Sequence, residues 1–156
     1  RELAREWDPI AHKHGMTLSW PPEGKPLPTV QADPDHVVQI LTNLLDNAIK
    51  YSPAGQEVQV SASVIRDHLR ITVTDHGIGI GSDDLPRIFE RFHRVVTPTM
   101  YRERGTGLGL FITRQLVEQQ GGQIMVSSQP GQGSSFAFTL PLAKAVVDTQ
   151  DQRRAA

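Results

Sequence analysis

The chain has 156 residues, of which 38% are hydrophobic and 21% charged, and its formal net charge is −1. This composition is typical of one folded domain with a single core, and the near-neutral charge gives no indication of binding to nucleic acid or to an anionic membrane. Because the sequence has no cysteine, disulfide frameworks, thiolate metal sites and cysteine nucleophiles are excluded. No apolar run approaches the roughly 18 residues that cross a bilayer.

The N-terminal part alternates polar segments with short apolar ones. Residues 1–15 are polar and weakly helical, as expected of the end of a linker. Residues 16–20 alternate apolar and polar side chains, which predicts a short strand. Residues 21–28 are rich in proline and predict a loop, and residues 30–32 fit a second short strand.

A helix is predicted from Asp33 to about Ser52. Asp33 is a suitable N-cap, and Pro34 suits the first helical position. Apolar residues then recur at helical spacing, at Val37, Ile40, Leu41, Leu44, Leu45 and Ala48. This pattern gives the helix one broad apolar face.

One edge of this predicted helix carries polar groups. Asn43, Asn47 and Lys50 have the spacing i, i+4, i+7 and lie on one stripe, with Tyr51 beside them. Asparagine is a poor helix former, so two on one stripe need a reason. An amide oxygen is a possible Mg²⁺ ligand, and an ammonium group suits phosphate. A solvated helix face would show the same pattern.

The rest of the chain contains further elements, separated by glycine and proline. In chain order they are strands over 57–64 and 69–75 joined by a hairpin at 66–67, a short helix over 83–92, a loop over 93–106, a helix over 108–120, and strands over 123–129 and 134–140 joined by a turn at 130–133. The charged tail after residue 142 is expected to fray. Two antiparallel hairpins among helices predict the α+β class.

Asp75 stands in register with the apolar residues of its predicted strand. A carboxylate on an apolar face is costly to bury unless a donor satisfies it. Gly77 and Gly79 follow, and glycine lets a flat ligand approach closely. A planar base with an exocyclic amine would satisfy Asp75, whereas an ordinary turn capped by aspartate is the alternative.

A glycine-rich sequence, Gly105-Thr106-Gly107-Leu108-Gly109-Leu110, leads into the helix predicted at 108–120. The free N–H groups and the dipole of a helix N-terminus attract anions, and glycines let phosphate approach. The spacing matches neither a P-loop nor the dinucleotide-binding Gly-x-Gly-x-x-Gly. Flexible entry into a helix would also explain these glycines.

Arginines concentrate in one part of the chain. Six lie between residues 87 and 114, at Arg87, Arg91, Arg94, Arg102, Arg104 and Arg114. A loop with this charge could close over a polyphosphate. A solvated charged surface is the alternative for each arginine taken singly.

Five short sequences occur in a fixed order: NLLDNAIKYS (43–52), DHGIGI (75–80), IFERF (88–92), GTGLGL (105–110) and GQGSSF (131–136). Together they resemble the N box, the F box and the three glycine-rich boxes of the catalytic domain of bacterial sensor histidine kinases. The resemblance covers roughly residues 16–142. It implies a two-layer α/β sandwich of the Bergerat ATP-binding type, with a mixed, mostly antiparallel sheet on about three helices, as in gyrase B, the 90-kDa heat-shock chaperone and MutL.

The resemblance also implies roles for individual residues. It assigns Asn47 to Mg²⁺ and Asp75 to the adenine amine, and it places Asn43, Lys50 and Tyr51 near the phosphates and sugar. The other ATP-binding residues that it implies are Gly77, Gly79, Ile80, Phe92, Arg94, Arg104, Gly105, Thr106, Gly107, Leu108, Gly109, Leu110 and Ser134. Residues 93–104 would be a mobile lid, residues 1–15 a linker from a dimerisation domain, and residues 143–156 a disordered tail.

The family's phosphate-accepting histidine lies in a Ser/Phe-His-Glu/Asp-x-x-x-Pro context, which none of the six histidines has. The resemblance therefore implies transfer of the γ-phosphate of Mg-ATP to a histidine on a separate dimerisation domain of the same protein, with a response regulator downstream. No catalytic nucleophile and no nucleic-acid partner are expected here, and the fragment is expected to be monomeric. The resemblance also implies a cytoplasmic domain, and it is compatible with a full-length protein that is anchored in a membrane.

The ATPase relatives place a water-activating glutamate four residues before the metal-binding asparagine, where this chain has Asn43. An amide cannot act as a general base, so we expect the site to hold ATP for transfer rather than hydrolyse it fast. Two alternatives are a serine kinase of the anti-sigma type on the same fold, and a nucleotide-sensing module without transferase activity. The long arginine-bearing lid and the IFERF sequence count against the first.

Overall fold

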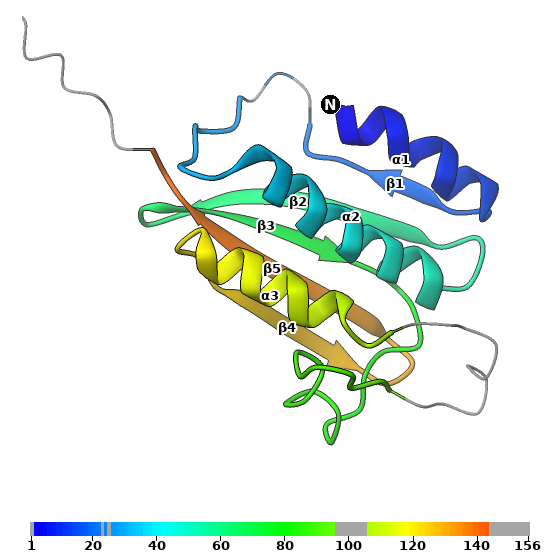
Figure 1. The fold of residues 1–156 in the computed structure, drawn as a ribbon. Helices are drawn as coiled ribbons and strands as arrows, with labels where there is room; N and C mark the ends of the chain where they lie inside the picture. The colour runs from blue at the N-terminus through cyan, green and yellow to red at the C-terminus, as the bar shows by residue number, and fades with distance from the viewer. Residues whose placement is uncertain (1, 23, 25, 96–105, 144–156) are drawn as a thin grey trace, which may run out of the picture.

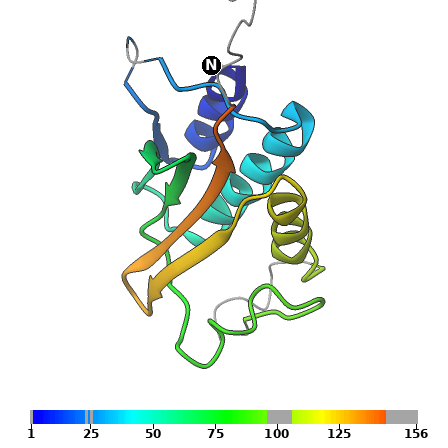
Figure 2. The same cartoon turned by 90° about the vertical axis from the view of Figure 1, so that its left-hand side faces the viewer.

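The computed structural model describes residues 2–22, 24, 26–95 and 106–143. Its elements in chain order are α1 (Glu2–Lys13), β1 (Thr17–Ser19), α2 (Pro34–Tyr51), β2 (Glu57–Ile65), β3 (His68–Thr74), α3 (Gly109–Gln119), β4 (Ile124–Gln129) and β5 (Gly133–Pro141). The three helices cover one face of the sheet, as Figures 1 and 2 show. The predicted two-layer α+β sandwich is therefore confirmed.

The sheet has five strands in the order β1-β2-β3-β5-β4. Strand β1 runs parallel to β2, and every other pair is antiparallel. Both predicted hairpins are present, since β2 pairs with β3 and β4 pairs with β5. The last strand, β5, lies between β3 and β4, so it joins the two hairpins into one sheet.

Helix α2 begins and ends close to the predicted positions. The Asp33 carboxylate accepts hydrogen bonds from the amides of Asp35 and His36, and Pro34 occupies the first turn. At the far end the helix stops at Tyr51 before Ser52. In the described part of the chain, no helix has the length and apolarity that crossing a membrane requires.

The core lies between the helices and the inner face of the sheet. Alternate residues of β3 and β5 are buried, as expected when one face of a strand is covered. The most deeply buried side chains come from both layers and include Ile40, Leu44, Leu45, Val58, Val73, Val117, Phe138 and Leu140. Burial of a side chain of this size stabilises the fold by about 1.5–3 kcal/mol.

The N-terminal segment, expected to be a weakly helical linker, forms helix α1 and packs on the domain. Trp7 and Ala11 are buried in the same core. The Trp20 indole Nε1 donates to the Asp8 carboxylate at 2.8 Å, which ties the helix to the chain after β1. The sequence did not predict this packing, because most side chains of α1 are polar and only one narrow edge of the helix is apolar.

Two predicted elements differ in the structure. The helix expected over 83–92 is a series of turns, in which most recorded backbone bonds span three residues, such as Asp84 N to Gly81 O and Arg87 N to Asp84 O. Pro86 has no N–H to donate, which disfavours a continuous helix here. The strand expected over 30–32 is reduced to one bridge, between Val30 and Leu142.

Candidate functional site

The ends of α2, β3 and β5 that carry most of the predicted site residues meet at one end of the sandwich. Figure 1 shows the C-terminal ends of α2 and β3 beside the start of α3, on the same side of the molecule. Since β5 runs antiparallel to β3, its first residues also lie at this end. The fold thus brings together groups that are far apart in the chain.

Asp75 follows β3 and is buried, with 7% of its surface exposed. Its Oδ1 accepts hydrogen bonds from the amides of Gly77 at 2.8 Å and Ser134 at 3.2 Å. Burial raises the pKa of this carboxyl, and the two amide bonds act in the opposite direction. Both hydrogen bonds that described residues donate to this carboxylate end on Oδ1, which leaves Oδ2 to accept from a ligand.

The glycine loop after Asp75 is held on both sides by backbone. The Ile78 amide donates to the Tyr51 carbonyl at the end of α2, and the Ile78 carbonyl accepts from Gly131 in the turn between β4 and β5. Gly79 has a φ of +70°, and a Cβ there would overlap the Gln129 carbonyl oxygen. The loop therefore needs glycine to pass between the two elements.

Ser134 and Ser128 face each other across β5 and β4. Ser134 is buried, and its hydroxyl lies 2.9 Å from that of Ser128. The Ser128 hydroxyl also accepts from the Ile80 amide and donates to the Gly133 carbonyl, each at 2.8 Å. One serine on β4 thus connects the glycine loop to the start of β5.

Asn43 connects α2 to α3. Its Nδ2 donates to Thr113 Oγ1 at 2.6 Å, and Thr113 Oγ1 donates to the Gly109 carbonyl at 3.0 Å. Thr113 is fully buried, and a Cβ on Gly109 would lie 2.5 Å from Asn43 Oδ1. Asn43 therefore fixes the position of the α3 N-terminus.

The other members of the polar stripe on α2 are half-buried. The Lys50 ammonium lies 5.3 Å from the centre of the Tyr51 ring, within cation–π distance. Asn47 is one turn before Tyr51 on the same helix. The described residues hold no group of three or more His, Cys, Asp or Glu side chains that would bind a metal by themselves.

Helix α3 starts without a side-chain cap. Its N-cap position is Leu108, and no side chain bonds to the first amides, which leaves them for an anion or water. Just before it, the Gly107 carbonyl accepts from the Phe92 amide at 2.9 Å. This bond joins the two ends of the predicted lid at their base, beside Thr106 and close to Leu110. Gly105 and residues 96–104 of the predicted lid, Arg104 among them, lie outside the described residues.

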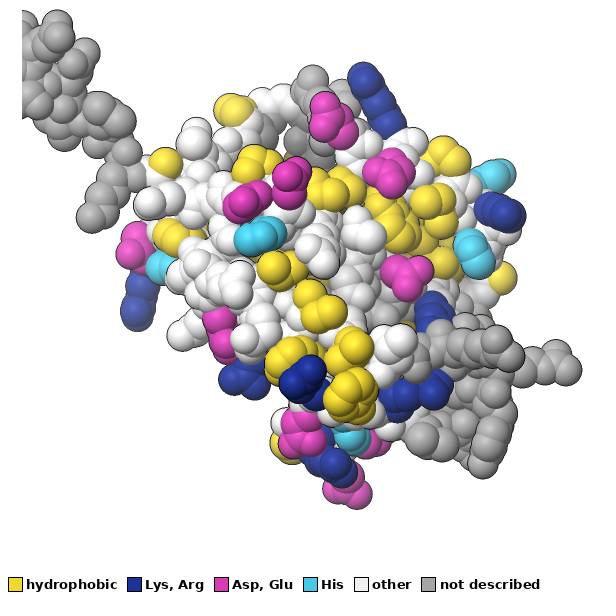
Figure 3. Space-filling model, viewed as in Figure 1, with side chains coloured by type: hydrophobic (Ala, Val, Ile, Leu, Met, Phe, Trp, Pro, Cys, Tyr) yellow, Lys and Arg dark blue, Asp and Glu magenta, His cyan; other side chains and the backbone are white. Residues whose placement is uncertain are grey.

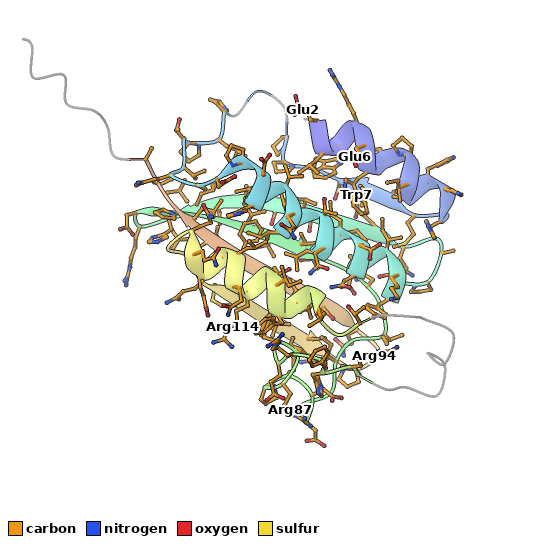
Figure 4. All side chains as sticks on the ribbon, in the orientation of Figure 1. Glu2, Glu6, Trp7, Arg87, Arg94 and Arg114 are labelled. Atoms are coloured by element: carbon orange, nitrogen blue, oxygen red, sulfur yellow. The ribbon has the colours of Figure 1, made fainter. Side chains whose placement is uncertain are left out.

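Cationic side chains lie on the turns after Gly81 and on helix α3, and Arg94 is the one labelled in Figure 4 beside this end of the molecule. Figure 4 shows Arg87, Arg94 and Arg114 on the side opposite Glu2 and Glu6, and Figure 3 shows Lys and Arg side chains at the same lower edge of the helical face. The turns after Gly81 border a shallow, open surface hollow of about 590 Å³, which is lined by Asp84, Arg87, Glu90, Arg91, Phe92, His93 and Arg94. Arg87 is paired with Glu90 at 3.2 Å and Arg114 with Glu118 at 2.7 Å, so the positive charge of these two side chains is partly offset.

The geometry fits a nucleotide. A hydrogen-bond acceptor without a partner at Asp75, the uncapped start of α3 and nearby cations match the donors of a base and the charge of phosphates. The structure places Asp75, Gly77, Gly79, Ile80 and Ser134 around one loop. Sequence reasoning missed Thr113 and Ser128, because neither belongs to a motif and each acts through segments distant in the chain.

Residues 32–144 match the model of the family described as "Histidine kinase-, DNA gyrase B-, and HSP90-like ATPase". The chain is 40% identical over 125 residues to the sensor histidine kinase WalK of Bacillus subtilis, covering 79% of this chain and 20% of that protein. It is 43% identical over 112 residues to the sensor-like histidine kinase SenX3 of Mycolicibacterium smegmatis, covering 72% of this chain and 29% of that protein.

Two solved structures have the same fold. Full-length ShkA in complex with AMPPNP has a TM-score of 0.78 and 37% identity, covering 93% of this chain and 29% of that one. The catalytic domain of the histidine kinase ThkA, in a nucleotide-free form, also has a TM-score of 0.78, with 25% identity and coverage of 92% of both chains.

Proposed function

Because the chain belongs to the histidine kinase-, DNA gyrase B- and HSP90-like ATPase family, we propose that it binds Mg-ATP and presents the γ-phosphate to a histidine on a separate dimerisation domain. The chain spans 20% of WalK and 29% of SenX3, the relatives compared above. The activity, substrates and partners of a whole kinase are therefore part of this proposal.

The buried Asp75 carboxylate is the observation that carries the proposal. It is costly to bury a charge for structure alone, and here Oδ1 is satisfied while Oδ2 remains to accept from a ligand. An exocyclic amine of adenine is a donor that fits this oxygen. Gly77, Gly79 and Ile80 provide the narrow loop beside it.

The start of α3 supports phosphate binding. The uncapped amides after Leu108 and the glycines at 107 and 109 favour close approach of an anion. Lys50, Tyr51 and Arg94 are proposed to contact the phosphates and sugar, and Phe92 to border the pocket. These residues bind and orient, while the nucleophile is supplied by the partner.

Asn43 supports transfer over hydrolysis. An amide cannot take a proton from water as a general base, and this one is engaged with Thr113 at 2.6 Å. The residue at this position would therefore not activate a water molecule near the γ-phosphate. The site is proposed to hold ATP until an acceptor imidazole arrives.

Asn47 is proposed to hold Mg²⁺ together with the phosphates. Mg²⁺ commonly takes one or two protein oxygens and completes its shell with phosphate and water, which fits a site without a carboxylate cluster among the described residues. When bound, the ion would neutralise charge on the phosphates. The amide of Asn47 would then fix the position of the triphosphate on α2.

The proposed partners are the dimerisation domain of the same protein and, through the whole kinase, a response regulator in a two-component signalling pathway. The same proposal includes a cytoplasmic location for this domain, within a full-length protein that could carry a membrane anchor. The domain is proposed to be monomeric and to act without nucleic acid.

Calorimetric titration with ATP and GTP, with and without Mg²⁺, tests the binding part. We expect adenine-selective binding that strengthens with Mg²⁺, and equal affinity for GTP would contradict the base pocket. The transfer part is tested by incubating the chain and γ-labelled ATP with the dimerisation domain of its parent. Label on the histidine supports a kinase, whereas binding without transfer supports a nucleotide-sensing module.

A further inference from the structure

Ser128 connects the glycine loop after Asp75 to the start of β5 through its side-chain hydroxyl. It lies on β4 opposite Ser134 and outside all the motifs that identified the site. Its hydroxyl oxygen makes three short contacts, to the Ile80 amide, the Gly133 carbonyl and the Ser134 hydroxyl.

The direction of each bond follows from the protons available. A serine hydroxyl has one proton and two lone pairs. The Gly133 carbonyl can only accept, so the Ser128 proton is used there, at 2.8 Å. The Ile80 amide can only donate, so it takes one lone pair of Ser128.

The remaining lone pair of Ser128 faces Ser134 at 2.9 Å. We assign the Ser128 proton to the Gly133 carbonyl, which can only accept, and with this assignment Ser134 donates to Ser128 in this pair. The Ser134 proton is thereby held away from any ligand, and its oxygen keeps lone pairs that no described residue fills. Ser134 is 8% exposed, so water has little access to turn the hydroxyl.

Ser134 is also fixed to Asp75 through the backbone. Its amide donates to the Asp75 carboxylate and the Asp75 carbonyl, at 3.2 and 3.3 Å, and the Asp75 amide donates to the Ser134 carbonyl at 2.8 Å. The backbone bonds hold Asp75 and Ser134 opposite each other where β3 ends and β5 begins. With the assignment above, Asp75 Oδ2 and Ser134 Oγ are both acceptors, and the Ser134 proton is directed at Ser128.

We propose that Ser128 is a positioning residue that makes Ser134 an acceptor-only group, so that the base pocket selects a purine with an amine at position 6 over one with an oxygen there. An exocyclic amine has two N–H donors for two acceptors, whereas a 6-oxo purine has lone pairs at position 6 and a single N–H donor beside it, at N1. This inference rests on the proposed function and assigns the origin of its base selectivity.

The experiment measures the affinities of the chain for ATP and inosine triphosphate, which differ at position 6 and at the adjacent N1. We expect Ser128→Ala to free the Ser134 proton and lower the ATP-to-ITP preference about three- to tenfold, the value of one hydrogen bond. Ser134→Ala should lower the preference similarly, and adding Ser128→Ala to it should lower it no further. Ser128→Thr keeps the hydroxyl and should restore the preference.

Ser127→Ala is the matched control, because Ser127 is an exposed neighbour on the same strand and should leave both affinities unchanged. A Ser128→Ala variant that loses ATP and ITP affinity equally would show a structural role only and overturn the proposal, as would an unchanged preference. A wild-type chain that binds neither nucleotide overturns the proposed function itself, which separates the two failures.

Discussion

Asp75 is a single residue in which ligand binding and stability oppose each other. Its carboxylate is desolvated, and burial raises its pKa above the ordinary value of 3.8. An asparagine in its place would still accept from Gly77 and Ser134 through its oxygen, without the cost of a buried charge. The same change would place an NH₂ group where Oδ2 now accepts.

We therefore predict that Asp75→Asn weakens ATP binding by about ten- to a hundredfold, the value of one hydrogen bond to a charged group, while the free energy of unfolding at pH 7 stays equal or rises. Calorimetry and urea unfolding on the same samples measure both effects. An affinity within twofold of the wild type would remove Asp75 from the base pocket. The ATP affinity of Asn47→Asp, measured in the same way, gives the comparison for a residue proposed to act at the phosphates rather than at the base.

The pH dependence of stability gives an independent test of the same residue. The folded protein holds the Asp75 proton more tightly than the unfolded chain does, so this group lowers the free energy of unfolding as pH rises from 3.8 through the raised pKa. Asparagine does not titrate there. We expect the stability difference between Asp75→Asn and the wild type to grow over this pH range and then level off; a difference that is constant with pH would contradict the desolvation.

At the scale of elements, the contact between α2 and α3 depends on a buried chain of hydrogen bonds. Asn43 donates to Thr113, and Thr113 donates to the Gly109 carbonyl. Thr113→Val keeps the shape but leaves the Asn43 amide without its acceptor, so we predict a loss of about 1–3 kcal/mol in the free energy of unfolding. Thr113→Ser should retain most of that stability in chemical denaturation, and equal losses for both variants would mean that packing dominates.

The loop between β3 and the turns that follow it tests the need for glycine. Gly79→Ala would force a positive φ on alanine and push Cβ into the Gln129 carbonyl, so we predict a loss of at least about 2 kcal/mol. Gly81→Ala is the control, because a Cβ there meets nothing within 4 Å. Thermal unfolding of the two variants measures the difference, and similar melting temperatures would show that the β4–β5 turn can move aside.

Periodicity predicted α2, α3 and the four strands of the two hairpins, because in each case one covered face leaves a regular apolar pattern. It failed over 83–92, where Ile88 is buried and Phe89 packs edge-on against Phe136. Those contacts are made by successive turns, and the spacing of apolar residues alone does not distinguish turns from a helix. The packing of α1 was missed because only Trp7 and Ala11 of this helix are buried, with Leu3 partly buried beside the core.

At the scale of the whole molecule, the candidate site was only partly predictable. Asp75 could be expected to be buried, because it continues the alternation of its strand. The contacts of Ser128 could not be expected, because its three partners are Ile80 in the glycine loop and Gly133 and Ser134 at the start of β5. Residues that recognise a ligand leave short motifs in the sequence, whereas residues that orient them depend on how distant segments meet.

Nucleotide binding should stabilise the whole domain through mass action. At a Mg-ATP concentration of 100 times the Kd, the free energy of unfolding is predicted to rise by about 2.7 kcal/mol. Because the described residues hold no carboxylate cluster for a metal, Mg²⁺ alone should have little effect, and chelation should weaken the effect of ATP. Thermal unfolding with each addition measures this, and equal stabilisation by Mg²⁺ alone would contradict metal binding through the phosphates.

The position of β5 in the middle of the sheet has a consequence for biosynthesis. Strand β3 pairs with a strand that is synthesised more than sixty residues later, since Leu69 pairs with Leu140 and Val73 with Phe136. Until that strand emerges, the β3 edge of the first hairpin and strand β4 both lack their pairing partner, and such unpaired edges are prone to aggregation. The nascent domain is thus most vulnerable just before its last strand is made, a period in which a chaperone would have most to protect.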